Sequence, residues 1–389
     1  MPIVNSIAAD HDLLTEWRRD IHMHPELGYE EHRTSELVAE RLASWGVEVT
    51  RNVAGTGLVG VIRGNGSSGR TIGLRADMDC LPMDEENDSP WKSVHPGRMH
   101  ACGHDGHTTM LLGAAKYLAE TRNFDGTVNV IFQPAEEGGA GGLKMVEEGL
   151  FERFPCDEVY GLHNAPMLPA GTIGVVPGPM MAAADRFSLT VQGKGGHAAM
   201  PHLSIDPVAI GAQIVTTWQT LVSRTADPIK SAVISTTMFH AGTAFNVIPD
   251  TASLDGTVRT FDPDMRDAME AGMTRIAEAV ATAMGGGADF RYERGYPPTV
   301  NHDRETGFAA AAAAATVGDA KVDATVPPVM GGEDFSYMLL ERPGAYIWLG
   351  GGVTGEDPGL HHPRYDFNDD VLPIGSSYFA NLVEMRLAR

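Results

Sequence analysis

The sequence predicts an α/β protein: one domain with a mostly parallel sheet flanked by helices, and an inserted ferredoxin-like domain of order βαββαβ. Helical and strand patterns alternate in the first and last parts of the chain, which is typical of a parallel sheet covered by helices. The middle part instead follows the strand and helix order of a compact ferredoxin-like unit. The chain has 389 residues, enough for two or three domains of about 150 residues each.

The first part of the chain contains the elements of the predicted main sheet. Helices are predicted over 34–45, where Val38 and Leu42 share one face, and over 110–118. Short apolar runs rich in β-branched residues predict four strands, at 58–62, 71–74, 127–132 and 159–162.

The middle of the chain contains two helices with clear starting signals. Asp206-Pro207 and Asp262-Pro263 each offer Asp as the N-cap and Pro at the first helical position. Apolar residues recur at helical spacing after both signals, at Ile210, Ile214, Trp218 and Leu221 and at Met265, Met269, Met273, Ile276 and Val280. Four strands are predicted around these helices, at 186–191, 231–239, 252–260 and 288–294.

The alternating pattern resumes after this segment, with a strand predicted at 345–349 and a last helix at 375–387. We therefore assign residues 185–295 to the inserted domain. Residues 1–184 and 296–389 form the catalytic domain, which is discontinuous in sequence.

The composition argues against several partners and compartments. The formal net charge is −22, and such an acidic surface repels phosphate backbones and anionic membranes, so neither nucleic acid nor a membrane is expected as a partner. No run of about 20 apolar residues is present, and the N-terminus shows no secretory signal. Three cysteines cannot form a disulfide framework, so a reducing cytoplasm is the expected location.

Five short segments concentrate side chains that bind metals. Asp77, Glu136 and His163 each follow or end a predicted strand, and ligands bind at the carboxyl ends of strands in open α/β sheets. Cys102 and His104 supply a thiolate and an imidazole, which suit zinc and related divalent metals better than magnesium. No CxxC pair is present, which argues against a structural zinc finger. Taken alone, such a Cys and His can also be packing residues.

The adjacent carboxylates Glu136 and Glu137 suggest two different roles. One of Glu136 and Glu137 can bind metal while the other takes a proton from the attacking water, although a loose acidic turn is the alternative. Asp77 can orient a ligand or bridge metals, or it can be a buried helix cap. His361 and His362 can be a ligand and its neighbour, or part of a polar loop. The glycine run at 138–142 matches neither GxGxxG nor GxxxxGK(S/T), and no GxSxG motif is present, so neither a nucleotide site at this run nor Ser-His-Asp chemistry is supported.

Ten motifs run in order over nearly the whole chain. They are HPELGYEE (24–31), LRADMD (74–79), MHACGHDGHTT (99–109), QPAEEGGAGG (133–142), GLHN (161–164), GKGGHAAMPH (193–202), NVIPD (246–250), GTVRTFDP (256–263), GGEDFSYM (331–338) and LHHPRYDFNDD (360–370). In these motifs the sequence resembles the dinuclear metal amidohydrolases that include hippurate hydrolase, N-acyl-amino-acid amidohydrolases, plant auxin-conjugate hydrolases and some carboxypeptidases. The resemblance implies a catalytic domain with two metals and a smaller domain used as a lid and for dimerisation.

The same resemblance implies roles for individual residues. The implied metal ligands are Cys102, His104, Glu137, His163 and His361. Glu136 is implied as the general base and later the general acid, and Asp77 as a carboxylate that supports the ligands. His197 is implied to act in trans on the partner's site by polarising the scissile carbonyl. Asn246 and Arg259 are implied to hold the carbonyl and carboxylate of the substrate.

Two positions depart from the pattern of this family. Cys80 stands where alanine is usual, and its thiol is a candidate for oxidation or for binding stray metal. The last motif usually reads His-Asn-Pro, whereas this chain has His361-His362-Pro363.

These observations together predict the function. We expect hydrolysis of the amide bond of small N-acyl-amino acids, hippurate-like or N-acetyl, to a carboxylate and an amino acid. The expected cofactors are two divalent ions per subunit (zinc, manganese, cobalt or nickel), and the expected assembly is a homodimer or a higher homo-oligomer. A metallo-carboxypeptidase or dipeptidase on the same scaffold is the nearest alternative. A non-catalytic metal-binding regulatory protein is the alternative from another class.

Overall fold

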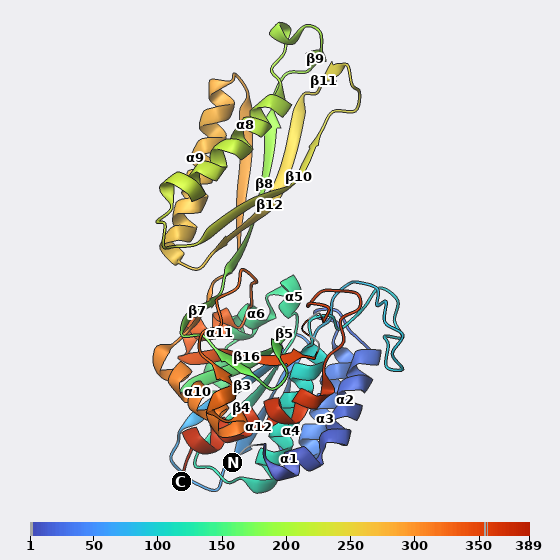
Figure 1. Ribbon diagram of the computed structural model, residues 1–389, viewed down its shortest axis with the longest axis vertical. Helices are drawn as coiled ribbons and strands as arrows, with labels where there is room; N and C mark the ends of the chain where they lie inside the picture. Colours follow the sequence, from blue (N-terminus) through green and yellow to red (C-terminus); the bar gives the residue numbers. More distant parts are fainter. Residues whose placement is uncertain (1–2, 354, 356) are drawn as a thin grey trace. The chain divides into compact units, whose positions relative to one another are not determined.

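The computed structural model describes residues 3–353, 355 and 357–389, and the chain forms two compact units (Figure 1). The first unit comprises Met1–Met180, Val300–Pro327 and Asp334–Arg389, and the second unit comprises Met181–Thr299 and Pro328–Glu333. The chain thus leaves the first unit, builds the second and returns. The short segment Pro328–Glu333, which the sequence analysis places in the catalytic domain, packs with the second unit.

An eight-stranded sheet forms the centre of the first unit. Its strands, in spatial order, are β1 (Glu48–Val53), β2 (Gly57–Arg63), β4 (Thr127–Gln133), β3 (Thr71–Asp77), β5 (Glu158–Pro169), β16 (Gly344–Gly352), β6 (Ile173–Val175) and β15 (Val322–Asp323). The four central strands, β4, β3, β5 and β16, are parallel, whereas β1, β2 and β6 join their inner neighbours antiparallel. The predicted α/β class with a mostly parallel main sheet is confirmed.

Helices enclose this sheet. Six of them share a core with its strands: α1 (Asn5–Ala9), α2 (His11–Met23), α3 (His32–Ser44), α4 (His104–Thr121), α10 (Asp303–Val317) and α12 (Leu372–Arg386). Four short helices also belong to the unit: α5 (Glu136–Gly139), α6 (Gly141–Glu147), α7 (Leu150–Arg153) and α11 (Ser336–Glu341). The central strands β3 and β4 are buried beyond their first residue, as expected of a sheet covered by helices.

The second unit has the predicted βαββαβ order. Its elements are β8 (Ala183–Gln192), α8 (Pro207–Thr220), β10 (Ala232–Ala241), β12 (Thr251–Thr260), α9 (Pro263–Ala283) and β13 (Gly287–Tyr296). The four strands form an antiparallel sheet in the order β10-β12-β8-β13. This is the strand order of a ferredoxin-like unit, because the first and third strands are central and the second and fourth lie at the edges.

Local signals explain where the helices of the second unit begin. The Asp206 carboxylate accepts hydrogen bonds from Val208 N and Ala209 N, and the Asp262 carboxylate accepts one from Met265 N. Such caps are worth about 1 kcal/mol each. The predicted apolar faces of α8 and α9 then pack on the sheet, where the fully buried Trp218 is a central residue.

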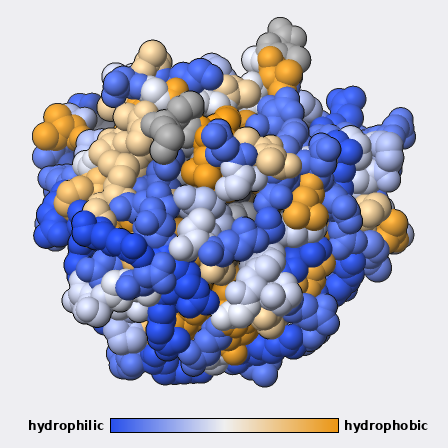
Figure 2. All heavy atoms as spheres, turned by 90° about the horizontal axis from the view of Figure 1, so that it is seen from below, coloured by the Kyte–Doolittle hydropathy of each residue, from blue (hydrophilic) through white to orange (hydrophobic). Residues whose placement is uncertain are grey.

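The remaining elements are short. A ribbon of β9 (Gly196–His197) and β11 (Val247–Ile248) extends the second unit, and β7 (Gly178–Met181) pairs with β14 (Thr299–Asn301) where the chain passes between units. Single turns of 3-10 or π helix lie at η1 (Pro201–Leu203), η2 (Leu221–Thr225), η3 (Asp319–Lys321) and η4 (Asp369–Val371). Hydrophilic side chains cover most of the face in Figure 2, consistent with the net charge of −22. Each helix of the described residues is too short or too polar to cross a bilayer.

Candidate metal centre

Side chains of the types that bind metals gather where β3 and β4 end and beside the middle of β5 in the first unit. Asp77 is the last residue of β3, Glu136 follows β4 by three positions, and His163 lies in β5. The parallel strands β3, β4 and β5 carry these remote segments to one edge of the sheet. The α4 helix begins there as well, with His104 as its first residue and Gly103 as its N-cap at φ 93°. A side chain at position 103 would meet Asn164 at 2.4 Å, so glycine is required.

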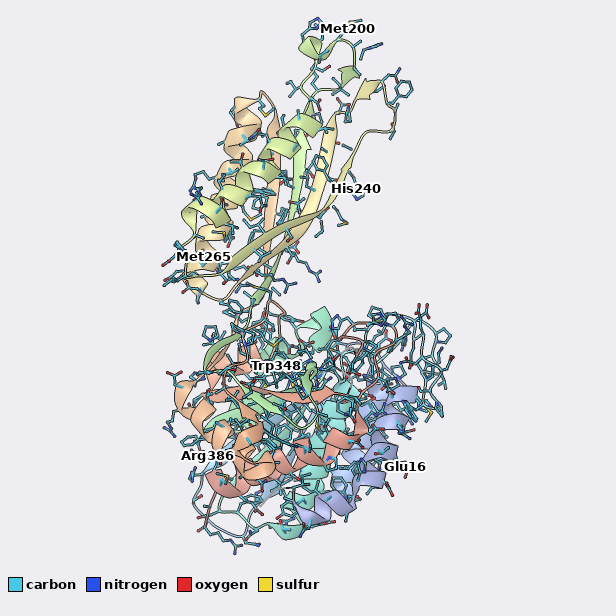
Figure 3. The ribbon with its side chains drawn as sticks, viewed as in Figure 1. Glu16, Met200, His240, Met265, Trp348 and Arg386 are labelled. Atoms are coloured by element: carbon cyan, nitrogen blue, oxygen red, sulfur yellow. The ribbon has the colours of Figure 1, made fainter. Side chains whose placement is uncertain are left out.

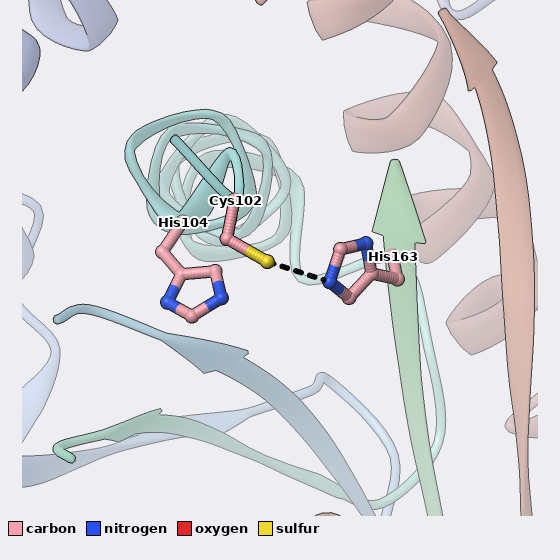
Figure 4. Close-up of side chains that lie close together, drawn as sticks. All are labelled: Cys102, His104 and His163. Carbon is pink, nitrogen blue, oxygen red and sulfur yellow. Dashed lines mark hydrogen bonds between the residues drawn. The ribbon is translucent and has the colours of Figure 1, made fainter. Parts of the chain in front are cut away.

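A thiol and two imidazoles form the inner part of this cluster (Figure 4). Cys102 Sγ lies 3.5 Å from His163 Nε2, and His104 lies beside both, with the three ligand atoms within 4.8 Å of one another. Burial, with Glu137 and Glu136 close by, raises the pKa of the Cys102 thiol well above its ordinary value. A cation between these groups would favour the thiolate, so the cluster suits a positive charge.

A second group lies next to the first and shares one residue with it. Glu137 Oε1 is 3.3 Å from His361 Nε2, and Cys102 completes a set whose ligand atoms lie within 4.8 Å. His361 has a left-handed backbone, with φ 63°, and its N–H donates to Ala101 O at 2.8 Å. The two candidate ligand groups are therefore adjacent and share Cys102.

His104 is held with one ring nitrogen directed into the cluster. Its Nδ1 lies 2.9 Å from Asp79 O and 3.2 Å from Asp79 Oδ1, which assigns the Nδ1 proton to these acceptors. Nε2 is buried and has no hydrogen-bond partner among the residues that the structure describes. Burial alone lowers the pKa of His104, but Asp77, Asp79 and Glu137 raise it to about 10. The position is therefore built for a proton or a metal ion, and the residues fit a metal.

His163 is held in the same way but stays neutral. Its Nδ1 lies 2.8 Å from Asn164 O, so Nδ1 donates and Nε2 faces Cys102. Burial lowers the pKa of His163 well below its ordinary value, and neutral imidazole is the form that binds metals. The neighbouring strand places Trp348, labelled in Figure 3, beside it, with ring centroids 5.6 Å apart.

Asp77 lies next to this cluster, between His107 and Arg75. Its Oδ1 is 2.6 Å from His107 Nδ1, and Arg75 donates to its Oδ2 at 2.7 Å. Burial alone would raise the pKa of Asp77, but Arg75, His104 and His107 hold it well below its ordinary value. The residue is a buried, charged carboxylate whose oxygens are held by neighbouring side chains.

Asp79 is a site residue that the sequence analysis did not identify. Its Oδ2 accepts the Glu137 backbone N–H at 2.9 Å while its other acceptors hold His104. One buried carboxylate thus holds two of the proposed ligands, which lie 33 positions apart in the sequence. The sequence feature that could have identified Asp79 is its position: it lies two residues after Asp77, in the loop that follows a predicted strand.

Glu136 lies at the edge of the cluster with a buried carboxylate, since it is 6% exposed. One of its carboxylate oxygens lies within 4.8 Å of ligand atoms of His104 and Glu137, and its Oε1 accepts the Asp334 N–H at 3.4 Å. Ala135, just before it, has a left-handed backbone and donates its N–H to Glu31 at 2.8 Å. The loop is therefore built into the protein and is not a loose acidic turn.

The two departures from the family pattern lie in different settings. His362 Nδ1 accepts the Arg364 N–H at 3.1 Å in a local turn, whereas His361 faces Glu137. Cys80 is buried, and its N–H donates to Glu26 O at 2.9 Å. Burial raises the pKa of the Cys80 thiol, which keeps it protonated and unreactive.

The other three predicted site residues lie in the second unit. His197 pairs with Val247 in the ribbon of β9 and β11, next to Asn246, whose carbonyl accepts the Ala198 N–H at 3.0 Å. Arg259 lies near the other end of β12, eight residues after its start, which corresponds to about 26 Å at 3.3 Å per residue. Within this unit the structure therefore brings His197 and Asn246 together but not Arg259.

Comparison with known proteins identifies the family. The family model for peptidase family M20/M25/M40 matches residues 73–385. The chain belongs to this family. The resemblance seen in the ten motifs is thereby confirmed.

This M20/M25/M40 chain is similar to several curated proteins along almost its whole length. It is 42% identical to an N-acetylcysteine deacetylase of Bacillus subtilis, with 96% of this chain and 97% of that protein covered. It is 41% identical to a hippurate hydrolase of Campylobacter jejuni, with 94% of each chain covered. It is 40% identical to thermostable carboxypeptidase 2 of Saccharolobus solfataricus, with 96% and 95% covered.

A solved structure from the same family has the same fold. It is described as a dinuclear metal-binding peptidase from the M20 family of Bacillus subtilis. The two chains share 37% identity and a TM-score of 0.85, with 98% of this chain and 99% of the other covered.

Proposed function

We propose that this chain hydrolyses the amide bond of small N-acyl-amino acids, hippurate-like or N-acetyl, to a carboxylate and an amino acid. One observation carries the proposal: Glu136, a buried carboxylate outside the proposed ligand set, lies beside His104 and Glu137. Relatives named N-acetylcysteine deacetylase and hippurate hydrolase support the choice of substrate class.

The proposed ligands of two divalent ions are Cys102, His104, Glu137, His163 and His361. Their mixture of sulfur, nitrogen and oxygen donors suits zinc, manganese, cobalt or nickel. When bound, such ions polarise the substrate carbonyl and make water easier to deprotonate. Asp77 and Asp79 keep the ligands in place, since each holds a proposed ligand or its neighbour.

Glu136 is the proposed general base. Its carboxylate takes the proton from the attacking water and later passes it to the nitrogen of the leaving amino acid. A positioned base of this kind contributes about 10²- to 10⁴-fold in rate. Because Glu136 is buried beside Glu137, its position favours proton transfer inside the site over exchange with solvent.

Residues of the second unit are proposed to hold the substrate. Arg259 can donate two parallel hydrogen bonds to the substrate carboxylate, and Asn246 can hold the carbonyl. His197 is proposed to polarise the scissile carbonyl of a partner subunit. The separation of about 26 Å along β12 between Arg259 and the strand's other end supports a division between two sites.

The proposal therefore includes a homodimer in which the second unit acts as lid and dimerisation domain and the first unit as catalytic domain. We place the enzyme in the cytoplasm, because Cys80, Cys102 and Cys156 are free thiols and Cys102 must remain reduced to bind metal. A metallo-carboxypeptidase or dipeptidase activity is the second candidate, favoured by the similarity to a protein named carboxypeptidase.

The test is an activity screen of protein reconstituted separately with each of the four metals. Hippurate and N-acetyl-amino acids are compared with dipeptides and blocked peptides, and released amino acid is measured. The proposal predicts chelator-sensitive hydrolysis of the N-acyl-amino acids at the highest kcat/KM. Faster cleavage of peptides would favour the carboxypeptidase candidate. Tight binding of metal without hydrolysis of any substrate would favour a regulatory protein.

A further inference from the structure

Two cationic side chains one turn apart on α2 are buried in the first unit without any role in the proposed chemistry. Arg18 and His22 are each 0% exposed. Burial of charge is costly unless the charge is paired and hydrogen-bonded. The partners of Arg18 and His22 therefore explain why these residues are present, and the partners lie on the segments that carry two proposed metal ligands.

His22 holds the first turn of α4. Its Nδ1 is 2.8 Å from Asp105 Oδ2, and Asp105 directly follows the proposed ligand His104. The other oxygen, Oδ1, is buried without a hydrogen-bond partner among the residues that the structure describes. The position of the Asp105 side chain thus depends on its hydrogen bond with His22. Arg18 NH1 lies 3.6 Å from the same oxygen, Oδ2. Burial alone would lower the pKa of His22, but Asp105 and Glu85 raise it to about 9, so both ring nitrogens donate.

Arg18 holds the segment that follows the other proposed ligand, His361. Its Nε and NH2 bind the two oxygens of Asp369 at 2.6 and 2.9 Å, and its NH1 is 3.6 Å from Asp366. Such a two-point arginine–carboxylate pair fixes both distance and orientation. The His361 side chain is itself half exposed, so packing around its ring restrains it little.

The loop beginning at Glu85 is hydrogen-bonded both to α2 and to the segment that follows His361. Glu85 Oε1 lies 3.4 Å from the second ring nitrogen of the buried histidine. The next residue, Glu86, donates its N–H to Pro363 O at 2.7 Å, and Asn87 Nδ2 donates to Tyr365 O at 2.7 Å. The loop, α2, the start of α4 and the 361–369 segment therefore form one hydrogen-bonded framework.

We propose that Arg18 and His22 are positioning residues that hold His104 and His361 at the separation the metal centre requires. The carboxylates that pair with them in the described part of the chain, Asp105, Glu85, Asp366 and Asp369, are not proposed ligands. Replacing a group that orients metal ligands typically costs about 10- to 100-fold in metal affinity or activity. The inference rests on the proposed function, because it requires the metal centre.

The test uses two conservative variants of the full chain, His22→Asn and His22→Gln. Both lose the imidazole charge, but the Asn amide can replace Nδ1 and keep the bond to Asp105, whereas the Gln amide can replace Nε2 and reach Glu85. Zinc affinity is measured by competition with a chromophoric chelator, and unfolding temperatures are measured without metal. We expect His22→Gln to bind zinc about 10- to 100-fold more weakly and His22→Asn to retain most of the affinity.

A purely structural role would lower the metal-free unfolding temperature and leave zinc affinity unchanged in the folded variants. Equal zinc affinity in the wild type and both variants, or equal loss in both, would overturn the inference. A wild type that binds fewer than two ions would overturn the proposed function as well, so the two failures are distinguishable.

Arg18→Lys is a second variant that tests the same inference if His22→Gln does not fold. Lysine keeps the charge but cannot form the two-point pair with Asp369. Arg33→Lys is the control, because Arg33 donates to both oxygens of Asp20, which lies on the same helix as Arg18. We expect zinc affinity to fall at least 10-fold in Arg18→Lys and to stay unchanged in Arg33→Lys. Equal affinity in the two variants would overturn the inference.

Discussion

Replacement of Asp79 by asparagine tests the geometry of the metal centre. Both carboxylate oxygens face N–H groups: Oδ2 accepts from Glu137 N at 2.9 Å, and Oδ1 lies 3.2 Å from His104 Nδ1. In Asp79→Asn one oxygen becomes an NH₂ group, which places a donor against a donor. Either the Glu137 N–H loses its acceptor, or the new NH₂ group faces the Nδ1 proton of His104, which then keeps only the backbone oxygen of Asp79 as its acceptor.

The magnitude follows from the bond that is lost. A hydrogen bond to a charged group is worth about 1.5–3 kcal/mol, and 1.36 kcal/mol corresponds to a factor of ten. Metal affinity should therefore fall about 10- to 100-fold, in line with other groups that orient metal ligands. The assay is a zinc competition titration of metal-free protein, followed by kcat with saturating metal.

A matched control separates this effect from a general loss of a carboxylate. Asp157 also accepts a backbone N–H, from Thr71 at 2.8 Å, but at the opposite end of β3 from Asp77. Asp157→Asn should bind zinc as tightly as the wild type. Unchanged zinc affinity in Asp79→Asn would refute the argument that Asp79 holds the ligands.

The remaining predictions concern the base, the substrate and the charge of the framework. Glu136→Gln should keep two metals and lose about 10²- to 10⁴-fold in kcat; retained turnover would remove its assignment as base. Arg259→Lys should raise KM for carboxylate-bearing substrates more than for their amides, and equal effects would show that Arg259 does not bind the carboxylate. Mixing His197→Ala and Glu136→Gln proteins should restore activity in exchanged dimers if His197 acts in trans; no recovery after confirmed exchange would contradict this. Because the pKa of His22 is raised to about 9, its stabilising contribution is complete below pH 6.5 and is lost as the pH rises through 9. The free energy of unfolding of the metal-free wild type should fall in this window relative to His22→Gln, and parallel pH profiles would contradict the pairing.

Features that depend on neighbouring residues could be predicted from the sequence. The Asp-Pro signals at 206–207 and 262–263 locate the starts of α8 and α9, because the caps need only the next three residues. The alternation of apolar strands and helices likewise indicates the main sheet. Both features follow from patterns within about ten residues.

The start of α4 shows why other features could not be predicted. The apolar pattern predicts a helix over 110–118, whereas α4 spans His104–Thr121. Its first turn contains His104, Asp105 and His107, which are polar and yet buried. These residues are stabilised by the partners Asp79, His22 and Asp77, which lie 25 to 83 positions away. No local pattern reports such contacts.

In the candidate site, too, some features follow from local sequence and others depend on contacts between distant residues. The predicted strand ends place Asp77, Glu136 and His163 together. Asp77 does end β3 and Glu136 does follow β4, whereas His163 lies in the middle of β5, which continues to Pro169. The part played by Asp79 requires knowledge of which backbone N–H its carboxylate accepts. The contact of Arg18 with Asp369 joins positions 351 residues apart, so it becomes visible only in the folded chain.

Five side chains from remote segments are proposed to hold two metal ions. Anomalous diffraction from crystals of the zinc-loaded enzyme tests this proposal most directly. We expect two peaks about 3.5–4 Å apart, with the Glu136 carboxylate beside them but bound to neither. The peaks should be in contact with the five proposed ligands, Cys102, His104, Glu137, His163 and His361. A single peak, or peaks that leave His163 or His361 without a metal, would contradict it.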